Sequence, residues 1–226
     1  MNRKFRLPES LLCQTLNEAK ILSNFSNSFF VIASNYDFKS NFDFVHYSHP
    51  ERKPIYRTIT RKNSDSDMVR KNYMHANLNN NEIDSILKFT LHDQHYIDAE
   101  LLSTRLLKLA LNQAHREPFH AFVKRYFDYI TYFFNADKEI NKGRIIDLCF
   151  WNIFIIDDKK WIHFDLEWKP KYEDYSLITE FVLFRSLLHW LVTVAGPFLT
   201  HFRTKMGIST YKDFIVDVFC YLNLEF

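Results

Sequence analysis

Three side chains that carry oxygen interrupt an otherwise apolar stretch in the second half of the sequence. Asp147 and Asn152 lie five positions apart in DLCFWN, and Asp165 follows thirteen positions later in FDLEW. Carboxylate and amide oxygens are the kind of ligand that Mg²⁺ prefers, and proteins often share this ion with the phosphates of a nucleotide. A carboxylate can also accept the proton of an attacking hydroxyl group. These residue types predict phosphate chemistry, provided that the fold brings them together.

The segments around these residues predict how they meet. IFII and KWIHF have the composition of two β-strands joined by the turn DDKK, and such a hairpin brings Asn152 and Asp165 to the same end. Asp147 then lies in the loop just before the first strand. The alternative is that the two acids are turn or cap residues that flank ordinary strands.

This order of residues resembles the protein-kinase fold, in which a catalytic loop of the form D-L-x-x-x-N is followed by a hairpin and a metal-binding Asp. The resemblance implies that Asp147 is the catalytic base. It implies that Asn152 and Asp165 are the ligands of Mg²⁺ and that ATP is the phosphoryl donor.

Upstream residues extend the same resemblance into a smaller lobe. MVRK is similar to the strand that delivers a phosphate-binding lysine, which makes Lys71 the candidate and Glu82, in the following predicted helix, its ion-pair partner. Arg57 and Arg61 alternate along the preceding predicted strand, so they share a face and can meet phosphate. For Lys71 and both arginines, the alternative is a position on a solvated strand surface.

A more specific resemblance covers roughly residues 25–195. YSHPERKPIYRTITRK, MVRK, DLCFWN and FDLEW…LFRSLLHWL together resemble the kinase-like domain of bacterial surface-polysaccharide proteins. These include the bifunctional methyltransferase/kinases that terminate O-antigen chains. In that group Asp-x-Glu-Trp replaces the usual Asp-Phe-Gly, and Glu167 fits the form as a structural residue or a further metal-site residue. The resemblance implies MgATP-dependent phosphoryl transfer to a hydroxyl of a sugar or glycan in lipopolysaccharide synthesis.

The sequence also departs from that family. The turn SHPERKP contains no glycine, so backbone amides cannot close over phosphates as a Gly-rich loop does, and Ile145 stands where kinases commonly carry His. Between the helix predicted around Glu82 and the helix beginning near Asp98, the chain is too short for two further strands and a hinge. No glycine motif of a methyltransferase is present. These departures favour an alternative function, a catalytically inactive pseudokinase module that binds a methyltransferase or glycosyltransferase partner. A remnant of a longer gene is a third possibility.

The predicted elements place strands first and helices later, which indicates an α+β protein with a reduced β-rich N-terminal lobe and a mainly helical C-terminal lobe. We expect a helical extension over residues 1–25, the small lobe with one short helix over 26–95 and the helical lobe over 96–226. Hydrophobic periodicity predicts strands at 28–34, 42–47, 55–62 and 67–71. It predicts helices at 8–24, 81–89, 98–113, 118–134, about 176–195 and about 210–223.

Composition narrows the class of protein. A chain of 226 residues with 47% hydrophobic residues can bury a sizeable core, and 29 basic against 27 acidic residues argues against a nucleic-acid-binding protein. Three widely spaced cysteines among apolar neighbours predict a protein of the reducing cytoplasm. Association with the inner face of the membrane is expected only through partners. The most hydrophobic stretch of the sequence, FVLFRSLLHWLVTVAGPFL, carries Arg185 and His189 near its centre. These polar residues predict a buried helix in place of a transmembrane segment. A buried Arg185 needs a partner, and we expect Glu167 or Asp165.

Overall fold

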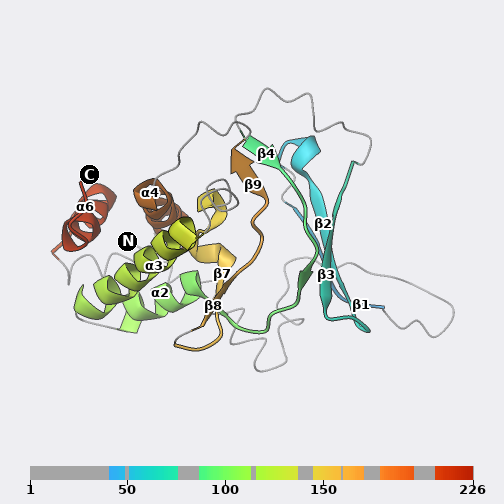
Figure 1. Cartoon of the computed structure of the whole chain (residues 1–226), viewed down its shortest axis with the longest axis horizontal. Coiled ribbons are helices and arrows are strands. Elements are labelled where there is room, and N and C mark those ends of the chain that lie inside the picture. Colours follow the sequence, from blue (N-terminus) through green and yellow to red (C-terminus); the bar gives the residue numbers. More distant parts are fainter. Residues whose placement is uncertain are drawn as a thin grey trace, which may run out of the picture.

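The computed structural model describes residues 41–48, 51–75, 87–112, 116–136, 145–158, 160–170, 179–195 and 207–225. The described part is α+β, with an antiparallel sheet on one side and helices on the other (Figure 1). The helix predicted at 8–24, the strand predicted at 28–34 and the residue Glu82 lie outside the described residues. Among the described helices, none combines the length and the apolar character that crossing a membrane requires.

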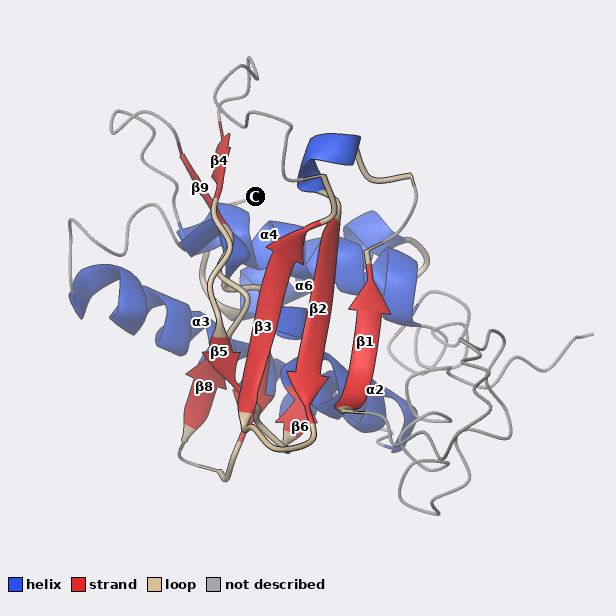
Figure 2. Cartoon of the chain, turned by 90° about the vertical axis from the view of Figure 1, so that its right-hand side faces the viewer, coloured by secondary structure: helices blue, strands red, loops and turns tan. Residues whose placement is uncertain are grey.

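The main sheet has four antiparallel strands in the order β1-β2-β3-β5. Figure 2 shows this sheet from the side that faces away from the helices. The strands are β1 (Phe42–Tyr47), β2 (Thr58–Asn63), β3 (Met68–Tyr73) and β5 (Gln94–His95). The predictions at 42–47 and 67–71 are confirmed. The strand predicted at 55–62 begins later, because Pro54–Tyr56 forms a 3₁₀ turn. The fixed φ of Pro54 and its missing N–H suit the first position of such a turn.

The end of the helix predicted at 81–89 is wrong. Residues Leu87–Phe89 form β4, which pairs with β9 (Trp168–Pro170) and places Phe89 opposite Trp168. The two rings lie 4.7 Å apart between centroids, and Phe89 is buried. Such an aromatic cross-strand pair stabilises strand pairing and outweighs a weak helical pattern. With β5, this stretch therefore supplies two short strands that the sequence pattern did not predict.

The hairpin predicted between Asn152 and Asp165 is confirmed. β7 (Ile153–Ile155) pairs with β8 (Trp161–His163), and β7 also pairs with the two-residue strand β6 (Glu100–Leu101). Two 3₁₀ turns, Ile145–Asp147 and Phe150–Asn152, lead into β7. In Figure 1, β7 and β8 lie between the helices and the main sheet. The hairpin therefore stands where the two parts of the molecule meet.

Four α-helices form the described helical part: α2 (Leu102–Asn112), α3 (Arg116–Ala136), α4 (Thr179–His189) and α6 (Tyr211–Tyr221). α2 begins later than the helix predicted at 98–113, because residues 100–101 pair with β7. α4 continues as a π-helical segment, Trp190–Ala195. Aromatic residues of α3, among them Phe119 and Tyr126, pack inward. One core joins the helices to the hairpin. Its largest fully buried side chains are Trp190, Tyr126, Phe119, Phe150 and Phe214. This core gives the hairpin a rigid support.

Candidate functional site

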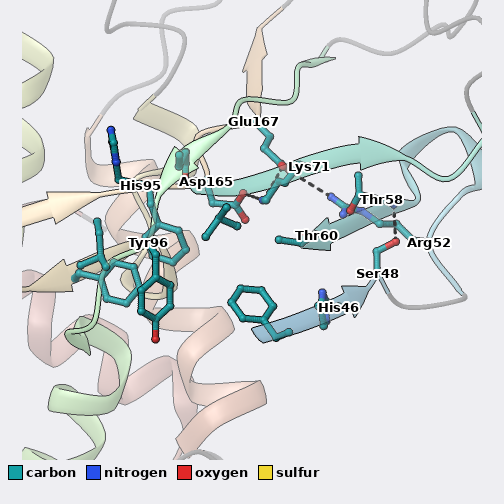
Figure 3. A pocket seen from close by; sticks show the side chains of 16 residues that line it. His46, Ser48, Arg52, Thr58, Thr60, Lys71, His95, Tyr96, Asp165 and Glu167 are labelled. Carbon is teal, nitrogen blue, oxygen red and sulfur yellow. Dashed lines mark hydrogen bonds and ion pairs between the residues drawn. The ribbon is translucent and has the colours of Figure 1, made fainter. Parts of the chain in front are cut away.

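A cavity of about 360 Å³ lies between the main sheet and the β7–β8 hairpin (Figure 3). Thr58 and Thr60 of β2 line it together with Lys71 of β3. Thr60 and Lys71 are direct partners in the antiparallel register, so their side chains lie on the same face of the sheet. The remaining lining residues come from β1, the turn after it, β3, the segment 94–97, β7 and the segment after β8: Phe44, His46, Ser48, Arg52, Val69, Gln94, His95, Tyr96, Ile97, Phe154, Phe164, Asp165 and Glu167.

Lys71 forms ion pairs with two acids of the segment that follows β8. Its Nζ lies 2.8 Å from Oε1 of Glu167, and it also forms an ion pair with Asp165. Figure 3 shows Lys71, Asp165 and Glu167 meeting at one side of the cavity. The side chain of Glu167 is only 7% exposed, and a charge at such a position needs a compensating partner. Lys71 is therefore not a solvated strand residue.

The backbone around Asp165 is held in an uncommon conformation. Asp165 has a φ of 59°, in the left-handed region that few residues other than glycine adopt. Its N–H donates to Oε1 of Gln94 at 3.1 Å, and the carbonyl of Asp165 accepts the N–H of Glu167 at 2.9 Å. Positions of this kind persist only where surrounding contacts fix them, and they are frequent at functional sites. The conformation places both carboxylates on the cavity wall.

Asp147 lies behind this wall. Its Oδ2 accepts the backbone N–H groups of Glu167 at 2.9 Å and Trp168 at 2.6 Å, and the residue is 4% exposed. Burial raises the pKa of Asp147 from 3.8 to about 6, although the N–H of Trp168 and the Arg185 guanidinium act in the opposite direction. The resemblance implied a carboxylate that meets an acceptor hydroxyl. In the structure Asp147 does not line the cavity and instead anchors the segment that carries Asp165 and Glu167.

Asn152 connects the two ends of the hairpin. Its Nδ2 donates to the carbonyl of Asp147 at 2.9 Å and to the carbonyl of Asp165 at a long 3.5 Å. The structure therefore brings Asp147, Asn152 and Asp165 together, and the joining groups are largely backbone. Within the described residues, no three His, Cys, Asp or Glu side chains converge as a metal site of their own. The donors that a divalent ion can share with phosphates here are the carboxylates of Asp165 and Glu167.

Arg185 does not pair with Glu167 or Asp165, so that expectation is wrong. From α4 its Nη1 donates to the carbonyl of Ile146 and lies 3.1 Å from Sγ of Cys149 and 3.8 Å from Oδ1 of Asp147. Its guanidinium also lies 5.6 Å from the centroid of the Trp151 ring. The reason is that α4 packs beside the 3₁₀ turn at 145–147, and Arg185 is not among the residues that line the cavity.

Neither arginine of the predicted 55–62 strand lines the cavity. Thr58 and Thr60 face it, so Arg61 faces the opposite side of the sheet, where its guanidinium lies 5.9 Å from the Phe42 ring. Arg57 donates from Nε to the carbonyl of Arg52 at 2.9 Å. The arginine that lines the cavity is Arg52, which was not among the predicted site residues. Its signal was the concentration of charge in the turn SHPERKP.

Comparison of the chain with protein-family models, with curated proteins and with solved structures gives no match. The chemistry of the cavity is therefore inferred from its own side chains. They are a lysine paired with two acids on one side, and a set of aromatic residues from the segment 94–97 and the hairpin on the other.

Proposed function

We propose that the protein is a kinase-like phosphotransferase that binds MgATP in the cavity and transfers a phosphoryl group to a hydroxyl. The observation that carries this proposal is the meeting of Lys71, Asp165 and Glu167 on the cavity wall. A small antiparallel sheet that contributes the lysine, and a hairpin followed by the acid, support the protein-kinase-like fold that the sequence resembles.

The ion pairs suit a site that exchanges partners with its ligand. Lys71 can move its charge from the two acids to phosphate oxygens, and the acids then become available to a divalent ion. When bound, Mg²⁺ supplies neutralisation of the charge that develops on the transferring phosphoryl group. The chain's own contribution is to hold the nucleotide in position and to exclude water, which are the main demands of phosphoryl transfer.

The acceptor class follows from the resemblance to polysaccharide kinases, so we propose a sugar or glycan hydroxyl. Asp147 lies directly behind Asp165 and Glu167, and its pKa of about 6 suits a group that exchanges protons near neutral pH. To accept a proton from the acceptor, its carboxylate must gain access past the backbone of residues 165–168. Turnover by an Asp147→Asn variant tests this role.

One observation favours a second function, a catalytically inactive module that binds a methyltransferase or glycosyltransferase partner. The carboxylate of Asp147 is buried and already accepts two backbone N–H groups, so it lacks the access that a base requires. In this alternative the cavity still binds nucleotide, but no phosphoryl group is transferred.

A titration of the melting temperature with ATP and Mg²⁺ tests the nucleotide site. A hundredfold excess of ligand over Kd stabilises the folded state by about 2.7 kcal/mol, which raises Tm by about 5 °C or more in a chain of this size. We expect this shift in the wild type and in Arg61→Ala, the matched control on the other face of the sheet. We expect no shift in Lys71→Ala. Equal shifts in all three proteins would contradict the proposed site.

A second measurement separates catalysis from binding. We expect the wild type to release ADP from MgATP in the presence of glycan acceptors, and we expect Asp147→Asn to bind MgATP normally while its turnover nearly disappears. Nucleotide binding without turnover in the wild type would identify the binding module. Equal turnover in Asp147→Asn would remove Asp147 from the mechanism.

A further inference from the structure

Arg52 is the second cation of the cavity and comes from the turn between β1 and β2. Its Nη2 lies 3.9 Å from Oε2 of Glu167, so Glu167 lies between the charges of Arg52 and Lys71. The guanidinium also lies 5.1 Å from the centroid of the Phe89 ring. The side chain is 32% exposed, and Figure 3 shows it reaching toward Lys71 and Glu167.

The backbone that carries Arg52 is fixed without glycine. The carbonyl of Arg52 accepts a hydrogen bond from the Nε–H of Arg57 at 2.9 Å. Two residues after Arg52, the 3₁₀ turn Pro54–Tyr56 begins. On the other side of the turn, Ser48 donates its N–H to the carbonyl of Thr58 and accepts the N–H of Thr58 on its hydroxyl. These contacts hold the ends of the turn against the sheet and keep Arg52 at the rim of the cavity.

We propose that Arg52 and Lys71 form a phosphate clamp that takes the place of a glycine-rich loop. This inference rests on the proposed nucleotide site and deepens it. A guanidinium presents several N–H donors in a planar fork that matches two phosphate oxygens, whereas a lysine contributes a compact point charge. Together they supply from side chains the hydrogen-bond donors that a glycine-rich turn supplies from its backbone.

The balance of charge specifies which polyphosphate the clamp takes. With the histidines neutral, the lining residues carry two cations, Arg52 and Lys71, and two anions, Asp165 and Glu167. A bare polyphosphate therefore meets as much repulsion as attraction. Its complex with a divalent ion satisfies both kinds of group, because the ion meets the carboxylates while the phosphates meet the cations.

The other side of the cavity specifies what the polyphosphate is attached to. Phe154 and Phe164 are stacked, with ring centroids 4.4 Å apart, and Phe44 and Tyr96 lie 6.4 Å apart at a tilt. In Figure 3, Tyr96 lies on the side of the cavity away from Arg52. Flat aromatic surfaces suit a purine or pyrimidine ring. The clamp therefore holds the phosphate end of a nucleoside diphosphate or triphosphate whose base lies toward the aromatic residues.

Isothermal titration of Arg52→Ala with three probes tests the clamp. The probes are MgATP, adenosine and magnesium tripolyphosphate. We expect Arg52→Ala to weaken MgATP and magnesium tripolyphosphate by at least tenfold and to change adenosine affinity by less than twofold. Arg61→Ala, on the opposite face of the same sheet, should leave all three affinities unchanged. Unaltered MgATP affinity in Arg52→Ala would overturn the clamp.

The same probes separate the clamp from the proposed function. If the wild type binds magnesium tripolyphosphate through Arg52 but binds neither MgATP nor adenosine, the clamp stands and the kinase-like function fails. If MgATP binds and Arg52→Ala has no effect, the function stands and the clamp fails. Binding of none of the three probes overturns both. If Arg52→Ala does not fold, Arg52→Lys is the variant to measure, because it keeps the charge and the aliphatic part of the side chain. Loss of the planar guanidinium alone should weaken MgATP affinity by at least threefold.

Discussion

Two charged clusters lie on opposite sides of residues 165–168, and they use their acids in different ways. The front cluster, Arg52, Lys71, Asp165 and Glu167, faces the cavity, and its carboxylates pair with side-chain cations. The rear cluster, Asp147, Asn152 and Arg185, faces the helices. Its carboxylate accepts backbone N–H groups. A ligand can replace a side-chain cation as the partner of these acids, but it cannot replace the backbone that carries them.

The difference separates binding from support. The front cluster has partners of both charges that an incoming metal–phosphate complex can take over one by one. In the rear cluster, hydrogen bonds of Asp147 and Asn152 join three segments: the 3₁₀ turn at 145–147, the start of β7 and residues 165–168. Under the proposed function, we expect changes in the front cluster to affect nucleotide binding and turnover. Changes in the rear cluster should affect stability, and Asp147, as the proposed base, should affect turnover as well.

The largest effect expected from the front cluster is on turnover, from Asp165→Ala. Under the proposed function Asp165 meets the metal–phosphate complex, and its loss should lower the rate of ADP release on the order of 10³-fold. Because alanine adopts the left-handed backbone of Asp165 less readily than aspartate does, the free energy of unfolding should fall by about 1–2 kcal/mol, less than the loss expected for the rear cluster. Asp158→Ala, in the exposed turn of the same hairpin, is the matched control and should behave as wild type. Full turnover in Asp165→Ala would break the distinction between the clusters.

The largest expected effect on stability comes from Asp147→Ala in the rear cluster. The N–H groups of Glu167 and Trp168 lose their acceptor, and unsatisfied buried donors cost about 1–3 kcal/mol each. We expect the free energy of unfolding, measured in urea, to fall by about 3 kcal/mol. Asp147→Asn keeps an oxygen acceptor and should lose about 1 kcal/mol. If both variants are as stable as wild type, the rear cluster does not support the fold.

The sequence predicted the elements whose evidence is local. α3 follows from apolar residues at helical spacing, including Phe119 and Tyr126, and the β7–β8 hairpin follows from two apolar runs around a polar turn. β4 was missed because its partner is β9, which is distant in the sequence, and the Phe89–Trp168 contact that stabilises it exists only after folding. Short strands paired over long separations leave little trace in a local pattern.

The candidate site divides in the same way. The positions of Asn152 and Asp165 at one end of a hairpin could be predicted from spacing, and so could the presence of Lys71 on a strand. The partners could not. Lys71 meets Glu167, and Arg185 meets the carbonyl of Ile146, because of how the sheet and α4 pack against the hairpin. Arg52 was overlooked because a charged residue in a turn looks solvated until the fold places a buried acid beside it.

The pH dependence of stability tests the rear cluster more finely. The folded pKa of Asp147, about 6, lies above its ordinary value of 3.8, so the folded state binds the proton more tightly than the unfolded state. The resulting contribution to stability is complete below pH 3.8 and is lost as the pH rises through 6. As the pH falls from 7 to 4.5, the free energy of unfolding of the wild type should rise by about 2 kcal/mol relative to that of Asp147→Asn. Urea unfolding of both proteins at each pH measures this difference. If the difference in free energy of unfolding between the two proteins does not change with pH, the two N–H groups and Arg185 offset the effect of burial on the pKa of Asp147.

The smallest expected effect comes from Arg185→Met, and it asks whether the clusters are independent. The variant removes the donor to the carbonyl of Ile146 and the charge near Asp147, while the stem of the side chain keeps its packing. Because the side chain is partly exposed, water can replace the lost donor, and the free energy of unfolding should fall by only about 1 kcal/mol. MgATP affinity, measured by isothermal titration, should stay within twofold of wild type, in contrast to Lys71→Ala. A tenfold loss of affinity in Arg185→Met would mean that residues 165–168 transmit changes from the rear cluster to the cavity, and support and binding would then be one system.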